Sequence, residues 1–167
     1  MLLSASSVQA GSLKASGGVT VTSQDLPLAG VSLAGGYKTE GPNLWVTNVD
    51  NQEFTLFYHS LSGTGNTSLQ GITGTSTVTF NAWEMGYFLT WNLGNYAVGP
   101  GLSYGVAETT DSNGVTNDSS AFMTATDVHY GAAHLRIEKT IFSINCDADL
   151  SSFGGLIGGS LLCGIDF

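Results

Sequence analysis

Six charged or polar residues near the C-terminal end of the chain stand at alternate positions in two groups. They are His134, Arg136, Glu138, Asn145, Asp147 and Asp149. Because successive side chains of a β-strand point to opposite faces, each group occupies one face of a strand. If these strands belong to a closed barrel, such side chains either line a lumen and select the solutes that pass, or form a closed network that fills the interior. We favour the closed network, since a barrel of about eight strands has an interior only wide enough for side chains.

The same residue types form no catalytic motif. Ser, His and Asp occur, but their spacing nominates no nucleophile with its base, and there is no phosphate loop, zinc cluster or nucleophile elbow. The run Asp111-Ser112-Asn113-Gly114 resembles the start of a calcium loop but lacks the later glutamate, so we expect an exposed acidic turn. We therefore expect a protein that is not an enzyme, with no cofactor and no metal.

The two cysteines, Cys146 and Cys163, flank the dipeptide Gly154-Gly155. Two glycines favour a type I′ turn, and a hairpin folded there sets the cysteines opposite each other. In an oxidising periplasm they could form a disulfide worth up to ~3 kcal/mol. Alternatively, they remain reduced, small apolar side chains. We favour the reduced pair, because a cross-strand disulfide needs particular geometry and the barrel already fixes this register.

Folding the chain at three turns sorts apolar from polar side chains. The turn at Gly154-Gly155 puts these pairs on one apolar face: Ile144 with Ile165, Ala148 with Leu161, and Phe142 with Phe167. The opposite face is polar except for Leu162. A connection centred on Lys139-Thr140 adds Ile137 and Leu135 to the apolar face, with Arg136 and His134 on the polar one. Three consecutive strands thus agree on which face is apolar.

A further hairpin about Gly94-Asn95 sets large side chains opposite one another and leaves a small reverse face. The expected pairs are Trp91 with Val98, Tyr87 with Leu102, Met85 with Tyr104, and Trp83 with Val106. Pro100 opposes this hairpin, because proline cannot donate to a sheet ladder. The alternative is an amphipathic helix over residues 83–93, against which Gly86 and the β-favouring side chains count.

Strand-like alternation recurs along most of the sequence. The runs are 17–25, 29–40, 43–50, 53–63, 76–92, 96–108, 120–138, 141–152 and 156–167. Bacterial barrels normally have an even number of strands, so we expect either that the first two runs are one strand or that 76–92 is two. Polar residues 64–75 and 109–119 are expected to be longer loops.

The composition limits the class of protein. Charged residues make up 10% and hydrophobic ones 42%, whereas a soluble domain carries about 25% charged residues. The net charge of -9, with four Lys and Arg in all, excludes a nucleic-acid partner. No run of 18 apolar residues is present, so only a closed β-barrel of this chain could cross a bilayer.

The chain has the size of a single domain. Residues 1–10 end in Val8-Gln9-Ala10, which resembles a signal-peptidase site, so this segment is either a signal-peptide remnant or a loose N-terminus. We expect residues 11–167 to form one β-barrel domain. The terminal residue Phe167, with Ile165 before it, resembles the aromatic signature by which outer-membrane barrels are recognised for assembly.

Residues 18–50 carry a family resemblance. They contain Gly18-Val19-Thr20-Val21-Thr22-Ser23, Gly30-Val31-Ser32, Gly35-Gly36-Tyr37 and Leu44-Trp45-Val46-Thr47-Asn48-Val49-Asp50. This pattern resembles the start of the TorF-like porin family, with Leu26, Pro27 and Leu28 departing from it. The resemblance implies an outer-membrane barrel with a role in solute passage, and it supplies no catalytic residues.

These patterns predict an all-β fold, an antiparallel up-and-down transmembrane β-barrel of about 8–10 strands. We expect it in the bacterial outer membrane, as a small porin or as a structural, surface-interaction barrel. Its partners would be outer-membrane lipid, the barrel-assembly machinery and small solutes. Because soluble barrels show the same alternation, the alternative is a secreted β-barrel or sandwich that binds a small apolar ligand inside. A third, weaker alternative is a self-assembling surface-layer or virion subunit.

Overall fold

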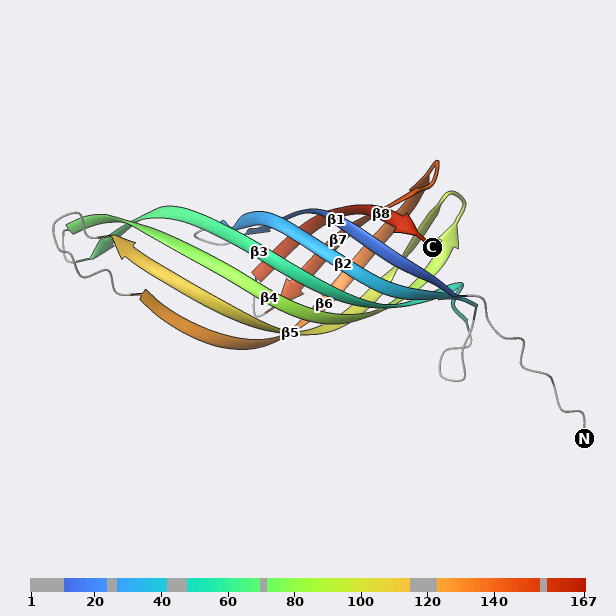
Figure 1. Ribbon diagram of the computed structural model, residues 1–167, viewed down its shortest axis with the longest axis horizontal. Helices are drawn as coiled ribbons and strands as arrows, with labels where there is room; N and C mark the ends of the chain where they lie inside the picture. Colours follow the sequence, from blue (N-terminus) through green and yellow to red (C-terminus); the bar gives the residue numbers. More distant parts are fainter. Residues whose placement is uncertain (1–10, 24–26, 42–47, 70–71, 115–122, 154–155) are drawn as a thin grey trace, which may run out of the picture.

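The computed structural model describes residues 11–23, 27–41, 48–69, 72–114, 123–153 and 156–167. They form eight antiparallel strands in one closed barrel (Figure 1). The strands are β1 (Gly11–Ser23), β2 (Ala29–Glu40), β3 (Asn51–Leu69), β4 (Ile72–Leu93), β5 (Tyr96–Gly114), β6 (Met123–Ile141), β7 (Ile144–Phe153) and β8 (Leu156–Asp166). The predicted all-β, up-and-down barrel is therefore confirmed. The expected signal remnant at residues 1–10 lies outside the described residues.

Each strand pairs with its neighbours in sequence, and β1 closes the barrel by pairing with β8. The C-terminal Phe167 takes part in this closure. Its backbone exchanges two hydrogen bonds with Leu13, at N···O distances of 2.8 and 3.2 Å. Closure leaves neither β1 nor β8 as a free sheet edge in this part of the barrel. Among the described residues, no helix has the length and apolar character to cross a membrane.

The eight strands lie within the expected range of 8–10, but the run that is not a strand is not the one expected. The first two runs are separate strands, β1 and β2, and 76–92 lies within the single strand β4, so both expected corrections were wrong. The surplus run is 43–50, where residues 48–50 are not in a strand and residues 42–47 lie outside the described residues. This segment carries β-favouring residues, but β2 already pairs with β3 along its length.

The two expected polar loops, 64–75 and 109–119, were wrong over the residues that the structure describes, while 70–71 and 115–119 lie outside them. Residues 64–69 and 72–75 belong to β3 and β4, and 109–114 belong to β5, including the expected turn at Asp111–Gly114. Beyond Ser62, β3 pairs only with β4, and before Ala132, β6 pairs only with β5. Strands β3 to β6 therefore run on past the other four as a four-stranded extension (Figure 1). Ser, Thr and Gly are abundant there. These residues are common in loops, so the sequence predicts a loop where the backbone forms paired strands.

Two of the three expected hairpins are confirmed in register. Cys146 pairs with Cys163 and Ala148 with Leu161, although the expected turn Gly154-Gly155 lies outside the described residues. All four pairs expected about Gly94-Asn95 are present. Hence residues 83–93 are strand and not helix. Pro100 is accommodated because the pairing of β4 with β5 is interrupted there. Leu89 and Thr90, which lie opposite Pro100 and Gly99, are not paired with them, so the missing N–H of Pro100 is not needed for this ladder.

The third hairpin turns at a different place. Phe142 and Ser143 form the turn between β6 and β7, with Phe142 at a φ of 58°, so the expected centre at Lys139-Thr140 and the Phe142–Phe167 pair were wrong. Ile137 pairs with Ala148 rather than with Phe142. This is an offset of six residues (148 − 142), and an even offset leaves every side chain on its expected face.

Candidate functional site

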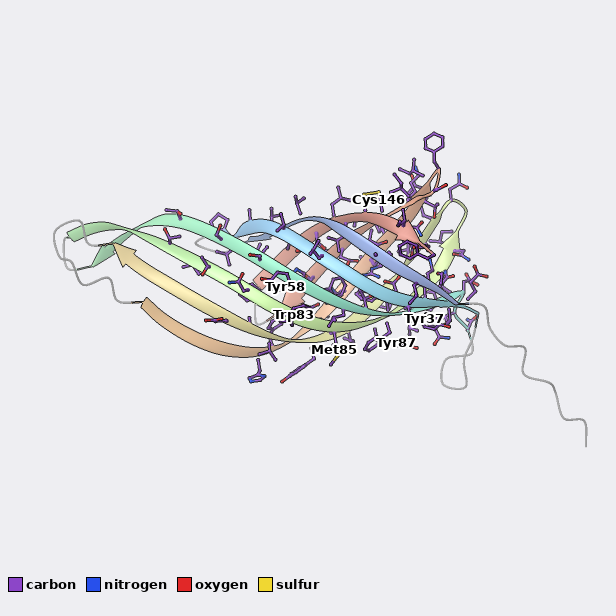
Figure 2. The ribbon with its side chains drawn as sticks, viewed as in Figure 1. Tyr37, Tyr58, Trp83, Met85, Tyr87 and Cys146 are labelled. Atoms are coloured by element: carbon purple, nitrogen blue, oxygen red, sulfur yellow. A yellow bond between two sulfur atoms is a disulfide. The ribbon has the colours of Figure 1, made fainter. Side chains whose placement is uncertain are left out.

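The outer surface of the barrel is an apolar belt. Ile144, Leu161 and Ile165, which the sequence places on the apolar face, are 48, 52 and 47% exposed. Residues of the same kind point outward from all eight strands, as Met85 does in Figure 2. They are Leu13, Val19, Val21, Val31, Leu33, Phe54, Leu56, Met85, Leu102, Val106, Leu135, Ile137, Leu150 and Ile157. A water-soluble barrel would bury these side chains, so this exterior is the reverse of one built for water.

Aromatic side chains mark both limits of the belt. Trp91, Tyr96, Phe142 and Phe167 are exposed near the rim where the chain ends. On the other side, Tyr58 of β3 and Trp83 of β4 are opposite residues whose rings lie 4.9 Å apart. The next outward pair along these strands is polar, because Ser60 donates a hydrogen bond of 2.9 Å to Asn81. Amphipathic rings at a boundary between apolar and polar surface are typical of a membrane interface.

The height of the belt fits a bilayer. In β5 the apolar outward residues run from Tyr96 to Val106, and in β8 they run from Ile157 to Ile165. A tilted strand of about 9–11 residues spans the hydrocarbon region, whose apolar band on such barrels is about 25 Å tall. Of the strands that the structure describes, β3 to β6 reach beyond this band on one side, as the extension.

The interior holds an ion-pair network centred on Arg136, which is 1% exposed. Its guanidinium donates to both carboxylate oxygens of Asp149 at 2.8 and 3.0 Å, and to Glu53 Oε1 at 2.7 Å. It also lies 3.5 Å from the ring centroid of Phe88. Paired, stacked and shielded from water, this cation is held in one position between β3, β4, β6 and β7.

Two lysines extend the network toward the rim where the chain ends. Lys14 Nζ lies 2.5 Å from Asp147 Oδ2 and 3.5 Å from Glu53 Oε2, while Lys38 Nζ lies 2.6 Å from Glu138 Oε1. With Arg136, three of the four basic residues of the chain are therefore paired inside the barrel. The chain has few charged residues, and many of them lie in the interior, where their ion pairs link β1, β2, β3, β6 and β7.

A second polar layer surrounds Glu84 of β4. His134 Nε2 lies 3.1 Å and His59 Nε2 lies 3.8 Å from its carboxylate, and Tyr130 donates a hydrogen bond of 2.9 Å to it. Ser103 lies within 2.7 Å of His134 Nε2. Residues from β3, β4, β5 and β6 therefore surround one carboxylate. Glu84, like Arg136 in the first layer, contacts several polar side chains.

Apolar side chains fill the space between and beyond these layers. Phe57, Phe88 and Leu162 pack together beside Arg136, so the one apolar residue on the predicted polar face, Leu162, is buried in the interior. A second cluster lies toward the extension, made of Leu28, Leu61, Phe80, Ala82, Ala107, Tyr130 and Ala132. The small reverse face of β5 makes room, because a Cβ at Gly101 would meet the ring of Phe88 and one at Gly105 that of Tyr130.

The cavities show how little of the lumen stays open. Between Phe57, His59, Glu84 and Tyr130 the free volume is about 30 Å³, room for no more than a few water molecules. At the rim where the chain ends, two polar recesses of about 350 and 310 Å³ share Lys38 and Glu138 as walls. The described part of the barrel thus has a vestibule at one end and a filled middle.

All six sequence-predicted lumen residues point into the barrel. Arg136, Asp147 and Asp149 share the central network, Glu138 pairs with Lys38, and His134 belongs to the Glu84 layer. Asn145 lies at the vestibule, hydrogen-bonded to Thr140 and Asp166. Their partners on β1 to β4 were not predicted from the sequence, because no hairpin was proposed in that part of the chain. The alternation of Glu53, Thr55, Phe57 and His59 carried that signal.

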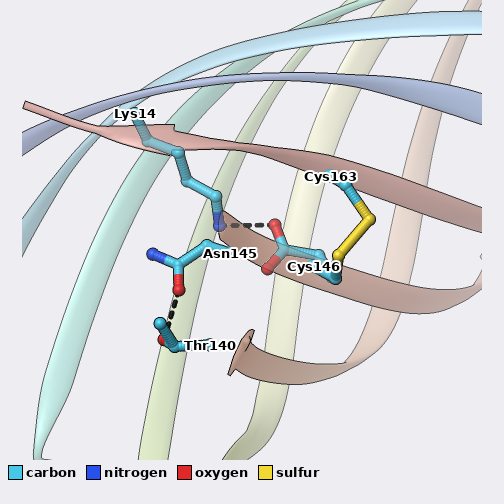
Figure 3. The surroundings of a disulfide bond; sticks show 6 residues. Lys14, Thr140, Asn145, Cys146 and Cys163 are labelled. Carbon is cyan, nitrogen blue, oxygen red and sulfur yellow. Dashed lines mark hydrogen bonds and ion pairs between the residues drawn. A yellow bond between two sulfur atoms is a disulfide. The ribbon is translucent and has the colours of Figure 1, made fainter. Parts of the chain in front are cut away.

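Cys146 and Cys163 form a disulfide across β7 and β8, with Cα atoms 4.1 Å apart (Figure 3). The expected opposition of the two residues is present, and the favoured reduced pair is not. The bond lies on the outward side of the two strands, whereas the adjacent Asp147 is 1% exposed and points inward to Lys14. It therefore fastens the last hairpin without taking part in the interior network. Across the described ranges, no three His, Cys, Asp or Glu side chains are placed to hold a metal ion.

A closed antiparallel barrel with an apolar exterior and a charged, filled interior is the class that these features define. No protein-family model matches the sequence, and no curated protein matches it. Among solved structures, Ail, the attachment invasion locus protein of Yersinia pestis, in a complex with the heparin analogue sucrose octasulfate, is similar in fold. The TM-score is 0.50 at 11% identity, covering 94% of this chain and 99% of that chain. Neisserial surface protein A aligns with a TM-score of 0.48 at 10% identity, over 93% of this chain and 95% of that chain. The chain shares its fold with small outer-membrane barrels.

Proposed function

We propose that this protein is an integral outer-membrane barrel that does not conduct, and that its role is structural or in surface interaction. The observation that carries the proposal is the inside-out distribution of side chains. Leu102 and Trp83 are 71 and 58% exposed, while Arg136 is 1% exposed. Lipid as the surrounding solvent explains both facts, because apolar side chains then face hydrocarbon and charges find partners inside.

A closed lumen supports the structural role over the porin role. The ring of Phe88 and the guanidinium of Arg136 lie against each other across the middle of the barrel, and Phe57 completes that layer. Passage of a solute would require breaking contacts that are fully buried. The resemblance of residues 18–50 to the TorF-like porin family therefore stays a prediction, and solute passage is not part of this proposal.

The four-stranded extension supports an interaction role. It continues past the apolar belt on the side opposite the chain ends, so in a membrane it would stand in water. In bacterial barrels the longer connections face the cell exterior and the short turns face the periplasm. The extension would then be presented at the cell surface. The proposal assigns the chain no enzymatic activity.

A secreted soluble barrel with an apolar pocket is the competing function. It requires the apolar face to line the interior, whereas the interior of the described barrel carries Arg136, Glu53, Asp147 and Asp149. Since burying that many charges in an apolar ligand site would be costly, the observed distribution of side chains favours the membrane.

Two measurements test the proposal. The chain, refolded into phosphatidylcholine vesicles, should run at a different gel mobility before and after boiling and should need detergent for extraction. In planar bilayers the inserted protein should be silent, and a variant with both Arg136→Ala and Phe88→Ala should show conductance steps because its middle layer is gone. Recovery as a soluble monomer would overturn the membrane placement, and steady conductance by the unaltered protein would overturn the closed barrel.

A further inference from the structure

We propose that the barrel carries a site for one acyl chain of a membrane lipid, in a groove on its outer face over β2, β3 and β4. The groove has a volume of about 250 Å³. It is lined by Leu33, Ala34, Gly35, Leu56, Tyr58 and Trp83. The inference rests on the proposed membrane placement and adds to it a ligand and its position.

The groove exists because the outward-facing residue at the centre of β2, Gly35, has no side chain. Gly35 is an outward position, paired with Leu56 of β3 and Ala15 of β1. A Cβ built there would meet only the carbonyl oxygen of Lys14, at 3.9 Å. The backbone therefore does not require glycine at this position, and a side chain would fit. Its absence opens a hollow among large outward residues.

The direction of the groove matches that of a lipid chain. Gly35 lies near the middle of β2 (Ala29–Glu40), and so near the middle of the apolar belt. From there the groove runs to Tyr58 and Trp83, whose rings lie 4.9 Å apart at a tilt of 48°. These two residues are neighbours on the outer face (Figure 2). Beyond them, Ser60 and Asn81 form polar surface. It thus leads from the interface on the extension side to the centre of the bilayer, as an acyl chain of that leaflet does.

The residues that line the groove suit the acyl chain of a lipid and not its headgroup. Every lining residue is apolar or aromatic, and none carries a charge. Of the four basic residues, three are paired inside the barrel and Lys139 lies at the opposite rim, beside Tyr96. A phosphate at the mouth of the groove would therefore find no cation from the chain, so affinity should follow the chain and not the charge of the lipid.

The test is lipid retention by the folded, full-length barrel released from nanodiscs and measured by native mass spectrometry. Phosphatidylcholine and phosphatidylglycerol with identical chains serve as probes. The unaltered protein should retain one lipid of either kind, and Gly35→Leu should lose it because leucine fills the groove. Gly159→Leu is the matched control. Gly159 also faces outward, and its Cβ would meet only Asp149 O at 3.9 Å, so this variant should retain the lipid.

Folding is verified in each variant by gel mobility before and after boiling, and Gly35→Val replaces the leucine variant should that one fail to fold. Equal retention by all three proteins, no retention by the unaltered one, or retention that follows the headgroup would overturn the site. Dimers that disappear in Gly35→Leu would overturn it too, since a second copy would then occupy the groove. A protein that inserts but retains no lipid contradicts only this site, whereas one that fails to insert contradicts the membrane placement itself.

Discussion

Replacing Arg136 by Met should destabilise the barrel more than any other removal of a single positive charge. The change keeps much of the side-chain length over Phe88 but removes three hydrogen bonds of 2.7, 2.8 and 3.0 Å to Glu53 and Asp149. Both carboxylates are buried and then lack their main cation. Removing one partner of a buried pair costs about 3–5 kcal/mol, because the remaining charge stays out of water.

The assay is equilibrium unfolding in urea of the protein folded into vesicles, followed by gel mobility and tryptophan fluorescence. A loss of about 3–5 kcal/mol lowers the folding constant by roughly a hundred- to several-thousand-fold. Lys139→Met is the matched control. It removes the same charge from a side chain at the outer rim, where it lies 3.1 Å from the hydroxyl of Tyr96. An exposed pair of this kind contributes about 1 kcal/mol or less.

Arg136→Lys separates charge from geometry. A lysine restores the positive charge but cannot donate to two oxygens of Asp149 in the same plane, so we expect an intermediate loss of stability. The reasoning would be refuted if Arg136→Met and Lys139→Met were equally stable. The interior would then be wet enough to solvate Glu53 and Asp149, and the lumen would not be closed at this layer.

Three further changes probe other parts of the structure. Replacing Cys146 and Cys163 together by Ser should lower stability by up to ~3 kcal/mol, because the disulfide joins residues 17 positions apart and limits the freedom of the unfolded chain, and reduction of the unaltered protein should reproduce this in the same urea assay. Gly101→Leu overfills the interior and should cost about 1–3 kcal/mol or prevent folding, whereas Gly131→Leu, on the outer face, should fold normally; equal behaviour would contradict the inward orientation of Gly101. Leu102→Lys, in the middle of the belt, should cost about 2–4 kcal/mol in vesicles, and a change below about 0.5 kcal/mol would mean that this position faces water.

The faces of the C-terminal strands could be predicted from the sequence because side-chain period alone decides them. The connection between β6 and β7 illustrates this. Its centre was misplaced from Phe142-Ser143 to Lys139-Thr140, yet Ile137 and Arg136 fell on the correct faces because the register error was even. The strand pairs about Gly94-Asn95 were also predictable, since a two-residue turn fixes every pair of a hairpin.

Whether the apolar face points outward could not be derived from alternation, which is the same in soluble barrels. The extension of β3 to β6 was missed for a related reason. Its Thr- and Ser-rich sequence lacks the regular alternation of apolar and polar residues that predicts a strand, and the pairing of its backbone with neighbouring strands is visible only in the structure. The interior network was predicted only in part, because Glu53 meets Arg136 across the barrel, at a sequence separation of 83 that no local pattern reports.

The direction in which Trp83 faces tests the account most directly. In a variant with Trp45 and Trp91 replaced by Phe, Trp83 is the only tryptophan, 58% exposed on the outer face of β4. After folding into phosphatidylcholine vesicles, its fluorescence should be quenched by bromine on the lipid chains, most strongly by bromine near their carbonyl ends, because Trp83 lies at the limit of the belt. Acrylamide in the water should quench it less than it quenches the unfolded chain. Quenching by acrylamide with no effect of brominated lipid would contradict the placement of the apolar belt in hydrocarbon.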